Sequence, residues 1–138
     1  MPTRGVRGAT VTTANEAEAI LAATRALLLA IRSANPSMQT EDLASILFTV
    51  SDELDAVYPA QAVHQLEWPG IPLICAREIP VPGGLSNCIR VLIHWNTDLP
   101  QDKIIHIYQK EAAQLRPDWV QKAQTASANS ETRLGEIS

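Results

Sequence analysis

The stretch Cys88-Ile-Arg-Val-Leu-Ile-His-Trp-Asn96 alternates between strongly apolar residues and residues that are mostly polar. Successive side chains of a β-strand point to opposite faces of the sheet. The alternation therefore predicts a strand whose apolar face carries Ile89, Val91, Ile93 and Trp95. The other face carries Arg90, Leu92, His94 and Asn96. A sheet with one apolar face packs against another layer, so the rest of the chain should supply helices to cover it.

The longest helix is predicted between Asn15 and Asn35. Asn15 is a favourable N-cap residue, and Glu18 stands three positions further on, which is the spacing of a capping box. Asn35 and Pro36 end the helix. The apolar spacing between these signals forms one continuous stripe, made of Ile20, Leu21, Thr24, Leu27, Leu28 and Ile31.

The other elements are shorter. Strands are predicted over residues 3–12, where Gly5 and Gly8 suggest a bulge or a close approach, and over 43–50 and 71–78. A short helix follows Pro59, and residues 104–108 fit a strand or a helix equally well. The order β-α-β-α-β-β predicts one α+β domain with a mixed sheet over residues 1–117. The polar composition of residues 118–138 predicts a flexible tail.

Composition narrows the class of protein. The chain has 138 residues and a net charge of −4, which argues against a nucleic-acid-binding surface. Cys75 and Cys88 are expected to be free thiols in a reducing compartment. The three histidines, His64, His94 and His106, do not have the spacing of metal ligands, so no metal site is expected. No apolar run is long enough to span a membrane and no signal peptide is apparent, so the cytoplasm is the expected location.

Arginines on strands are the first candidates for chemistry. Arg90 lies mid-strand, where a charged group is costly to bury unless it meets an anion. Arg7 lies beside Gly8, which would let a ligand or another chain come close. Arg4 is three residues from Arg7, so an extended chain places the two on opposite faces. Each arginine taken singly could equally be solvated at the surface. The residues alone favour a site for a small organic anion, without a nucleophile and its base.

Several motifs taken together resemble a known family. They are residues 4–10 (RGVRGAT), 56–60 (AVYPA), 75–78 (CARE), 83–91 (GGLSNCIRV), 97–102 (TDLPQD), and 106–108 (HIY) followed by 115–118 (LRPD). In this order they are similar to the small trimeric chorismate mutases of the AroH class, over residues 3 to 118. The resemblance implies an α+β fold with helices outside a trimeric pseudo-α/β-barrel, and sites at the subunit clefts.

The resemblance also implies a reaction. The family converts chorismate to prephenate, a Claisen rearrangement on the route to phenylalanine and tyrosine, without a covalent intermediate or a cofactor. Arg90 is expected at the ether oxygen, where negative charge develops as the C–O bond breaks. Arg7 and Tyr108 are expected to hold carboxylates, and Cys75 and Glu78 to meet the ring hydroxyl.

The remaining site residues also follow from the resemblance. Further expected substrate contacts are Ile74, Ala76 and Arg77 on one wall, Tyr58 and Ala60 in the apolar part, and Leu115 and Arg116 in a segment that closes over the site. Cys75 and Glu78 are three apart, so both reach one ligand through their side chains only if the strand bends near residue 77.

Two positions depart from the family pattern. Gln61 and His64 stand where the family often has a basic residue, so substrate capture is expected to depend on protonation of His64. Ile74 stands where threonine is common. The alternative to an enzyme is a non-catalytic trimeric module that binds a small carboxylate, and such a module would not need Arg90 beside an ether oxygen.

Overall fold

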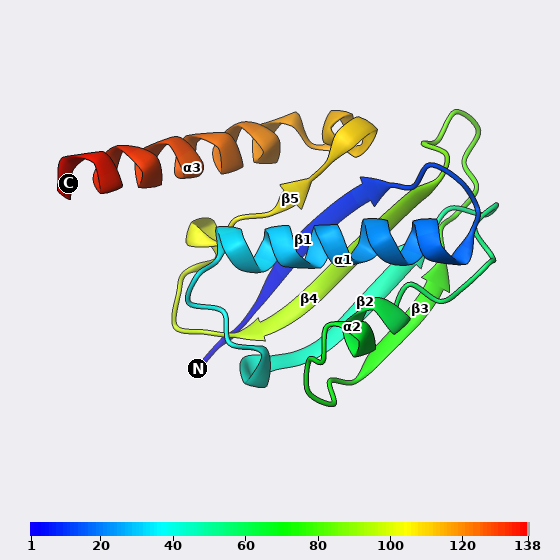
Figure 1. The fold of residues 1–138 in the computed structure, drawn as a ribbon, viewed down its shortest axis with the longest axis horizontal. Helices are drawn as coiled ribbons and strands as arrows, with labels where there is room; N and C mark the ends of the chain where they lie inside the picture. Colours follow the sequence, from blue (N-terminus) through cyan, green and yellow to red (C-terminus); the bar gives the residue numbers. More distant parts are fainter. Residues whose placement is uncertain (138) are drawn as a thin grey trace.

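Strand β4 (Cys88–Asn96), the alternating stretch, is the central strand of a five-stranded sheet (Figure 1). This computed structural model describes residues 1–137, with side chains as far as residue 127. The strand order is β3-β2-β4-β1-β5. Strands β1 (Thr3–Val11) and β2 (Leu43–Val50) flank β4 and run antiparallel to it. Strand β3 (Leu73–Arg77) is parallel to β2, and β5 (Ile107–Tyr108) is parallel to β1. The predicted mixed sheet is confirmed.

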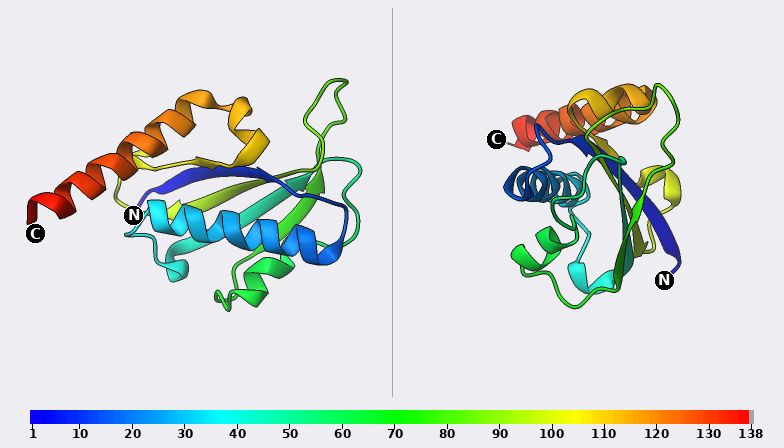
Figure 2. Two further views of the ribbon diagram at one scale, coloured as in Figure 1. Left: turned by 45° about the horizontal axis from the view of Figure 1, so that its top comes forward. Right: turned by 90° about the vertical axis from the view of Figure 1, so that its right-hand side faces the viewer.

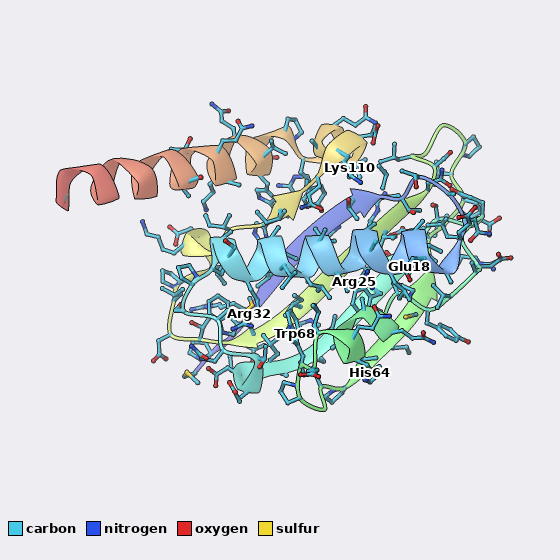
Figure 3. The ribbon with its side chains drawn as sticks, viewed as in Figure 1. Glu18, Arg25, Arg32, His64, Trp68 and Lys110 are labelled. Carbon is cyan, nitrogen blue, oxygen red and sulfur yellow. The ribbon has the colours of Figure 1, made fainter. Side chains whose placement is uncertain are left out.

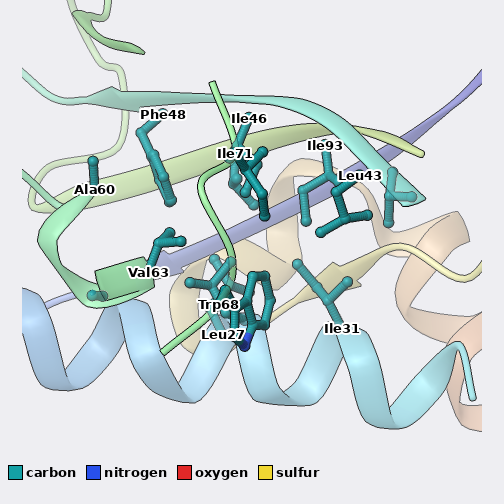
Figure 4. Close-up of a cluster of buried hydrophobic side chains, with 14 of the residues drawn as sticks. Leu27, Ile31, Leu43, Ile46, Phe48, Ala60, Val63, Trp68, Ile71 and Ile93 are labelled. Carbon is teal, nitrogen blue, oxygen red and sulfur yellow. The ribbon is translucent and has the colours of Figure 1, made fainter. Parts of the chain in front are cut away.

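One face of the sheet is covered by helices α1 (Ala17–Ala34) and α2 (Gln61–Gln65), which lie on the same side in Figure 2. All members of the predicted apolar stripe of α1 are buried. Leu27 and Ile31 point from α1 toward Ile46 and Ile93 of the sheet (Figure 4). The apolar face of β4 is buried as predicted, whereas Arg90 and Leu92 on its other face are only half-buried. The main core therefore lies between α1 and the sheet.

The predicted N-cap of α1 is wrong. The N-cap position is occupied by Glu16, which makes no side-chain cap hydrogen bond. Asn15 bonds instead to a distant loop, where its side-chain oxygen accepts the N–H groups of Asp55 and Ala56, each at 3.0 Å. Glu18 forms an ion pair of 3.2 Å with Arg25 on the surface of α1 (Figure 3). A local capping pattern was outweighed by a tertiary contact.

Gly8 is close to the helix, and the suggestion that a ligand or another chain approaches it is wrong. Gly8 lies opposite Val91, on the face that packs against α1. A Cβ atom at this position would lie 2.7 Å from Cδ1 of Ile31. The pairing of β1 with β4 is regular from Thr3 to Val11, so the suggested bulge is also absent from this strand. Gly8 makes room for the core.

The C-terminal segment is helical. Three short 3₁₀ helices, η1 (Thr40–Asp42), η2 (Gln101–Lys103) and η3 (Lys110–Leu115), occupy loops, and η3 leads into α3 (Pro117–Ile137). Composition predicted a flexible tail over 118–138; the structure describes helix over residues 117–137, because polar residues such as Gln, Lys and Glu are also good helix formers, and the flexibility of this segment stays a prediction. Within residues 1–137, none of the helices has both the length and the apolarity needed to cross a membrane.

Candidate active site

The predicted cationic residues share one face of the sheet. Ala9 of β1 lies directly opposite Arg90 of β4 and also opposite Tyr108 of β5. Residues directly opposite one another point to the same face, so Arg90, Ala9 and Tyr108 form a row across three strands. Arg7 pairs with Leu92, which places it diagonally from Arg90 on that same face. The face is the one opposite α1, and Ala9 is fully buried there against Tyr108 and Ala112.

Glu78 lies at the other side of Arg90. Its Oε1 is 3.3 Å from Nε of Arg90, and both side chains are about 30% exposed, at 29% and 30%. The hydroxyl of Thr49 donates a hydrogen bond to the same carboxylate oxygen. Thr49 is also the residue of β2 that pairs with Arg90. Thr49 thus fixes the carboxylate of Glu78, and this carboxylate holds one side of the Arg90 guanidinium.

The Nε–H group of Arg90 is an unused donor. Although Nε lies at ion-pair distance from Glu78, the geometry is not that of a hydrogen bond, and the atom is buried without any acceptor among the described residues. Buried polar groups are nearly always hydrogen-bonded, and an exception needs an explanation. The carboxylate of Glu78, 3.3 Å away, accounts for the burial of this atom, so a bound anion would meet the outer nitrogens of the guanidinium.

Arg90 borders two hollows in the surface. The larger is an open cleft of about 660 Å³ that Arg90 shares with Leu115 of η3 and Thr12 at the end of β1. The smaller, of about 180 Å³, places Arg90 beside Glu78 and the loop that follows it. The glycine-containing segment 83–87 lines the larger cleft. The guanidinium therefore lies where a small molecule can reach it.

Tyr108 is suited to donate a hydrogen bond. Its side chain is 7% exposed. Burial raises the pKa of the Tyr108 phenol, while the positive charges of Arg7, Arg90 and Arg116 act in the opposite direction. The phenol thus remains protonated at neutral pH, and three arginines around it make this region of the face positive.

Leu115 and Arg116 lie beside this group but are placed differently. Leu115 lines the cleft with Arg90 and packs against the cluster of Ala9, Tyr108 and Ala112. Arg116 pairs with Asp118 at 2.8 Å and stacks on Trp119, with its Cζ atom 3.3 Å from the ring centroid. The first turn of α3 therefore holds the Arg116 side chain.

A second group of predicted residues lies elsewhere. Tyr58, Ala60, Ile74 and Cys75 line a separate cavity of about 380 Å³, which includes Gln61, His64 and Leu73. Arg7, Glu78, Arg90, Tyr108 and Leu115 do not line it. Tyr58 and Ile74 are exposed, at 71% and 66%. His64 is also exposed, on the outside of α2 (Figure 3). The structure thus divides the predicted site residues into two groups. The cationic group comprises Arg7, Glu78, Arg90, Tyr108 and Leu115, and the apolar group comprises Tyr58, Ala60, Ile74 and Cys75.

Alternation along strand β3 separates Cys75 from Glu78. Cys75 pairs with Phe48 of the core, whereas Glu78 reaches Arg90 on the opposite face. The pairing of β3 with β2 is regular through Arg77, so the strand does not bend in the way that would bring both side chains to one ligand in this subunit. Burial raises the pKa of the Cys75 thiol, which is therefore a neutral group. Ala76 is exposed on β3, and Arg77 forms a surface ion pair of 3.1 Å with Asp52.

The chain is similar to known proteins over most of its length. The family described as Chorismate mutase type I matches residues 3–119. The chain is a type I chorismate mutase by family. It is 49% identical over 115 residues to the chorismate mutase AroH of Thermus thermophilus, covering 83% of this chain and 94% of that protein. It is 42% identical over 119 residues to the chorismate mutase AroH of Bacillus subtilis, covering 86% and 93% respectively.

A solved structure agrees with the family assignment. The chorismate mutase from Clostridium thermocellum superposes with a TM-score of 0.76 at 42% identity, covering 78% of this chain and 96% of that one. The family and the fold of the subunit predicted from the motifs are therefore confirmed, and the chain belongs with the isomerases.

Three residues that this chorismate mutase places beside the cationic group were not predicted. Thr49 became apparent only when the register placed it opposite Arg90. His106 and Trp119 stack at 4.0 Å between ring centroids, next to Tyr108. A tryptophan in an otherwise polar C-terminal segment was the one signal in the sequence that could have indicated an anchor there.

Proposed function

We propose that this chorismate mutase converts chorismate to prephenate at a site whose cationic side is built by Arg90, Arg7 and Tyr108. Chorismate carries two carboxylates, and the proposed roles give Arg7 and Tyr108 to carboxylate binding. Holding both ends of the substrate fixes the enolpyruvyl side chain over the ring, which supplies the orientation that a unimolecular rearrangement needs. The reaction serves the biosynthesis of aromatic amino acids, and we expect it to take place in the cytoplasm.

The guanidinium of Arg90, held by Glu78 at the border of two hollows, is the observation that carries the proposal. As the C–O bond of chorismate breaks, negative charge develops on the ether oxygen. A fixed donor beside that oxygen stabilises the transition state more than the ground state, which is the requirement for catalysis. Glu78 and Thr49 hold the guanidinium in place before the substrate arrives, so little reorganisation accompanies the reaction.

The separation of the two groups supports a homotrimer with shared sites. One subunit presents Arg90 and Tyr108 on its sheet face, and we propose that a neighbour supplies Tyr58, Ile74 and Cys75 to complete the same site. Exposed apolar side chains at Tyr58, Ile74, Ile79 and Val81 favour burial against another subunit. The half-buried sheet face that carries Leu47 and Leu92 would face the interior of the assembly.

An activity assay tests the chemistry. Purified protein is mixed with chorismate, and its loss is followed by absorbance for the wild type, Arg90→Ala and Arg32→Ala. Arg32 stacks on Trp68 on the helix side of the sheet, so this matched variant loses a cation away from the site. We expect Arg90→Ala to lose about 100-fold or more of its activity, with Arg32→Ala near wild type. Saturable binding of chorismate without any acceleration would favour the binding module.

A complementation assay tests the shared site. Arg90→Ala and Tyr58→Asp disable different groups, so each homotrimer should be inactive. Mixed trimers, prepared by joint unfolding and refolding, place an intact cationic group against an intact apolar group at about one quarter of the sites, by random assembly of a closed ring. Recovery of activity on mixing supports shared sites. No recovery, with trimers confirmed by light scattering, contradicts them.

A further inference from the structure

His106 accepts a hydrogen bond from the backbone of Arg7. The N–H group of Arg7 donates to Nδ1 of His106 at 2.9 Å. The parallel pairing of β1 with β5 begins only at Gly8 and Ile107, so the imidazole takes the place of a backbone acceptor just before the ladder starts. His106 is 8% exposed, and an Arg7 amide left unpaired in this position would be costly.

The position of His106 is fixed from both sides along the chain. Asn35, at the end of α1, donates to the carbonyl of Ile105 at 2.9 Å and accepts the N–H of the same residue at 3.0 Å. On the other side, the N–H of Gln109 donates to the carbonyl of Ala9 at 2.9 Å. The segment between these anchors carries His106 and Tyr108, so a shift of the imidazole would move Tyr108 as well.

Trp119 covers the imidazole. Its ring lies 4.0 Å from that of His106 at an angle of 33°, and it meets Tyr108 edge-on at 5.6 Å. Trp119 belongs to the first turn of α3, where Arg116 stacks on it. One aromatic side chain thus links the C-terminal helix to both the imidazole and the phenol.

The imidazole can accept this bond only in its neutral form, with its proton on Nε2. The charged groups that face it are Arg7 from β1, Arg116 before α3, and Lys122 and Asp118 on α3. Three of the four are cations and disfavour a further positive charge. Burial is the largest cause and these cations add to it, lowering the pKa of His106 from its ordinary value of 6.5 to about 4.

We propose that His106 is a positioning residue, which fixes the Arg7 backbone and thereby the carboxylate-binding pair Arg7 and Tyr108, and that Trp119 keeps it uncharged. The inference rests on the proposed roles of Arg7 and Tyr108. His106 itself does not touch the substrate. Its effect should therefore appear mainly in KM, because a loosened Arg7 weakens carboxylate binding while Arg90 remains in place.

The first experiment compares three substitutions at the buried position of His106 that differ in whether and where they offer a hydrogen-bond acceptor. His106→Asn carries an amide oxygen close to the position of Nδ1, His106→Gln carries its amide one bond further out, and His106→Leu has no acceptor. We expect His106→Leu and His106→Gln to lose about tenfold in kcat/KM, mostly through KM, from one lost hydrogen bond. His106→Asn should recover most of that loss. Equal activity in all three variants would overturn the proposal.

The second experiment follows kcat/KM against pH. The wild type should keep its activity down to about pH 5 and lose it toward pH 4, as His106 takes up a proton. Trp119→Ala exposes the imidazole to water, so the acidic limb should move up toward pH 6. The same Trp119 substitution made in His106→Asn should leave the limb unmoved, because an amide does not titrate. A shift of similar size in both backgrounds would contradict the role of His106.

A measurement that needs neither activity nor a variant separates this inference from the proposed function. The ¹⁵N resonances of His106 in the wild type should show a proton on Nε2 and a bare, hydrogen-bonded Nδ1 from pH 8 to pH 5. A charged ring or the opposite tautomer at pH 7 would refute the proposal even in an active enzyme. The expected tautomer in a protein that does not accelerate the loss of chorismate would instead refute the catalytic assignment alone.

Discussion

Replacing Gly8 by alanine should destabilise the fold, because the added methyl group enters the packed layer between β1 and α1. The new Cβ would lie 2.7 Å from Cδ1 of Ile31, 3.1 Å from Cγ1 of Val91 and 3.3 Å from the carbonyl oxygen of Ile107. Ile31 and Val91 are at most 1% exposed, so neither can move into solvent. Gly8 is not among the residues with positive φ, so alanine can adopt its backbone conformation and the cost comes from these contacts.

The magnitude follows from two opposing effects. Overpacking a close-packed core by a methyl group costs about 1–3 kcal/mol. Alanine also has less backbone freedom than glycine in the unfolded chain, which offsets about 0.5–1 kcal/mol of that cost. Taken at mid-range, the two effects leave a net loss of about 1 kcal/mol in the free energy of unfolding, which lowers Tm by about 4 °C in a domain of this size.

A double-mutant cycle identifies the clash. Ile31→Val removes the Cδ1 atom at 2.7 Å, and alone it should cost about 0.5–1.5 kcal/mol. Combined with Gly8→Ala it should cost less than the sum of the two, by about 1 kcal/mol, because the methyl group of alanine fills the space left by Cδ1. Urea unfolding is followed by circular dichroism at one fixed protein concentration, because oligomers change stability with concentration.

Gly5→Ala is the matched control. A Cβ at Gly5 would meet Cδ1 of Leu92 at 3.6 Å, an ordinary van der Waals contact, so this variant should change stability little. Gly8→Ala should also retain its kcat/KM within about twofold well below its Tm, because Gly8 faces the core and a loss of stability of this size leaves most molecules folded. The reasoning fails if Gly8→Ala is as stable as the wild type, or if its effect adds to that of Ile31→Val without coupling.

Three further predictions concern charge and loop contacts. His106 takes up a proton below about pH 6.5 in the unfolded chain but only near pH 4 in the folded protein. The contribution of neutral His106 to the free energy of unfolding is therefore complete above pH 6.5 and falls by about 3 kcal/mol as the pH drops to 4. Urea unfolding at pH 7 and 4.5 should show this loss of stability in the wild type, and His106→Asn should lack it. Arg90→Lys keeps the charge and loses the planar guanidinium, so turnover should stay badly impaired, and near-normal turnover would show that charge alone suffices at this position. Asn15→Ala removes the acceptor of the Asp55 and Ala56 amides and should cost about 1–3 kcal/mol in urea unfolding, while an unchanged midpoint would show that these bonds contribute nothing.

The fold was predictable where a short sequence pattern reflects which side chains of one element face the core. The alternation in β4 and the stripe of α1 each follow from which face meets the core, and both predictions are confirmed. Arg4 and Arg7 do lie on opposite faces, since Arg4 pairs with buried Trp95 and its Nε donates to the carbonyl of Leu99 at 3.0 Å. The face of each strand residue is a local property, so the sequence carries it directly.

Predictions failed where a local pattern competed with a distant contact. Asn15 has the right type and spacing for an N-cap, but it bonds to a loop 40 residues further along the chain. The polar composition after Pro117 gave no indication of helix α3, whose Trp119 packs against His106 and Tyr108. The contact of Asn15 leaves no mark in the neighbouring sequence, whereas Trp119 is itself the residue that could have indicated the second contact.

The motifs by themselves determined the family of this protein and the residue types that suit a dianionic substrate. Only the tertiary structure decided how those residues are grouped. The register of β1, β4 and β5 brings Arg7, Arg90 and Tyr108 onto one face, and the regular pairing of β3 directs Cys75 away from Glu78. Sequence spacing fixes which way a side chain points along its own strand, whereas the partner opposite it depends on how strands far apart in the chain are aligned.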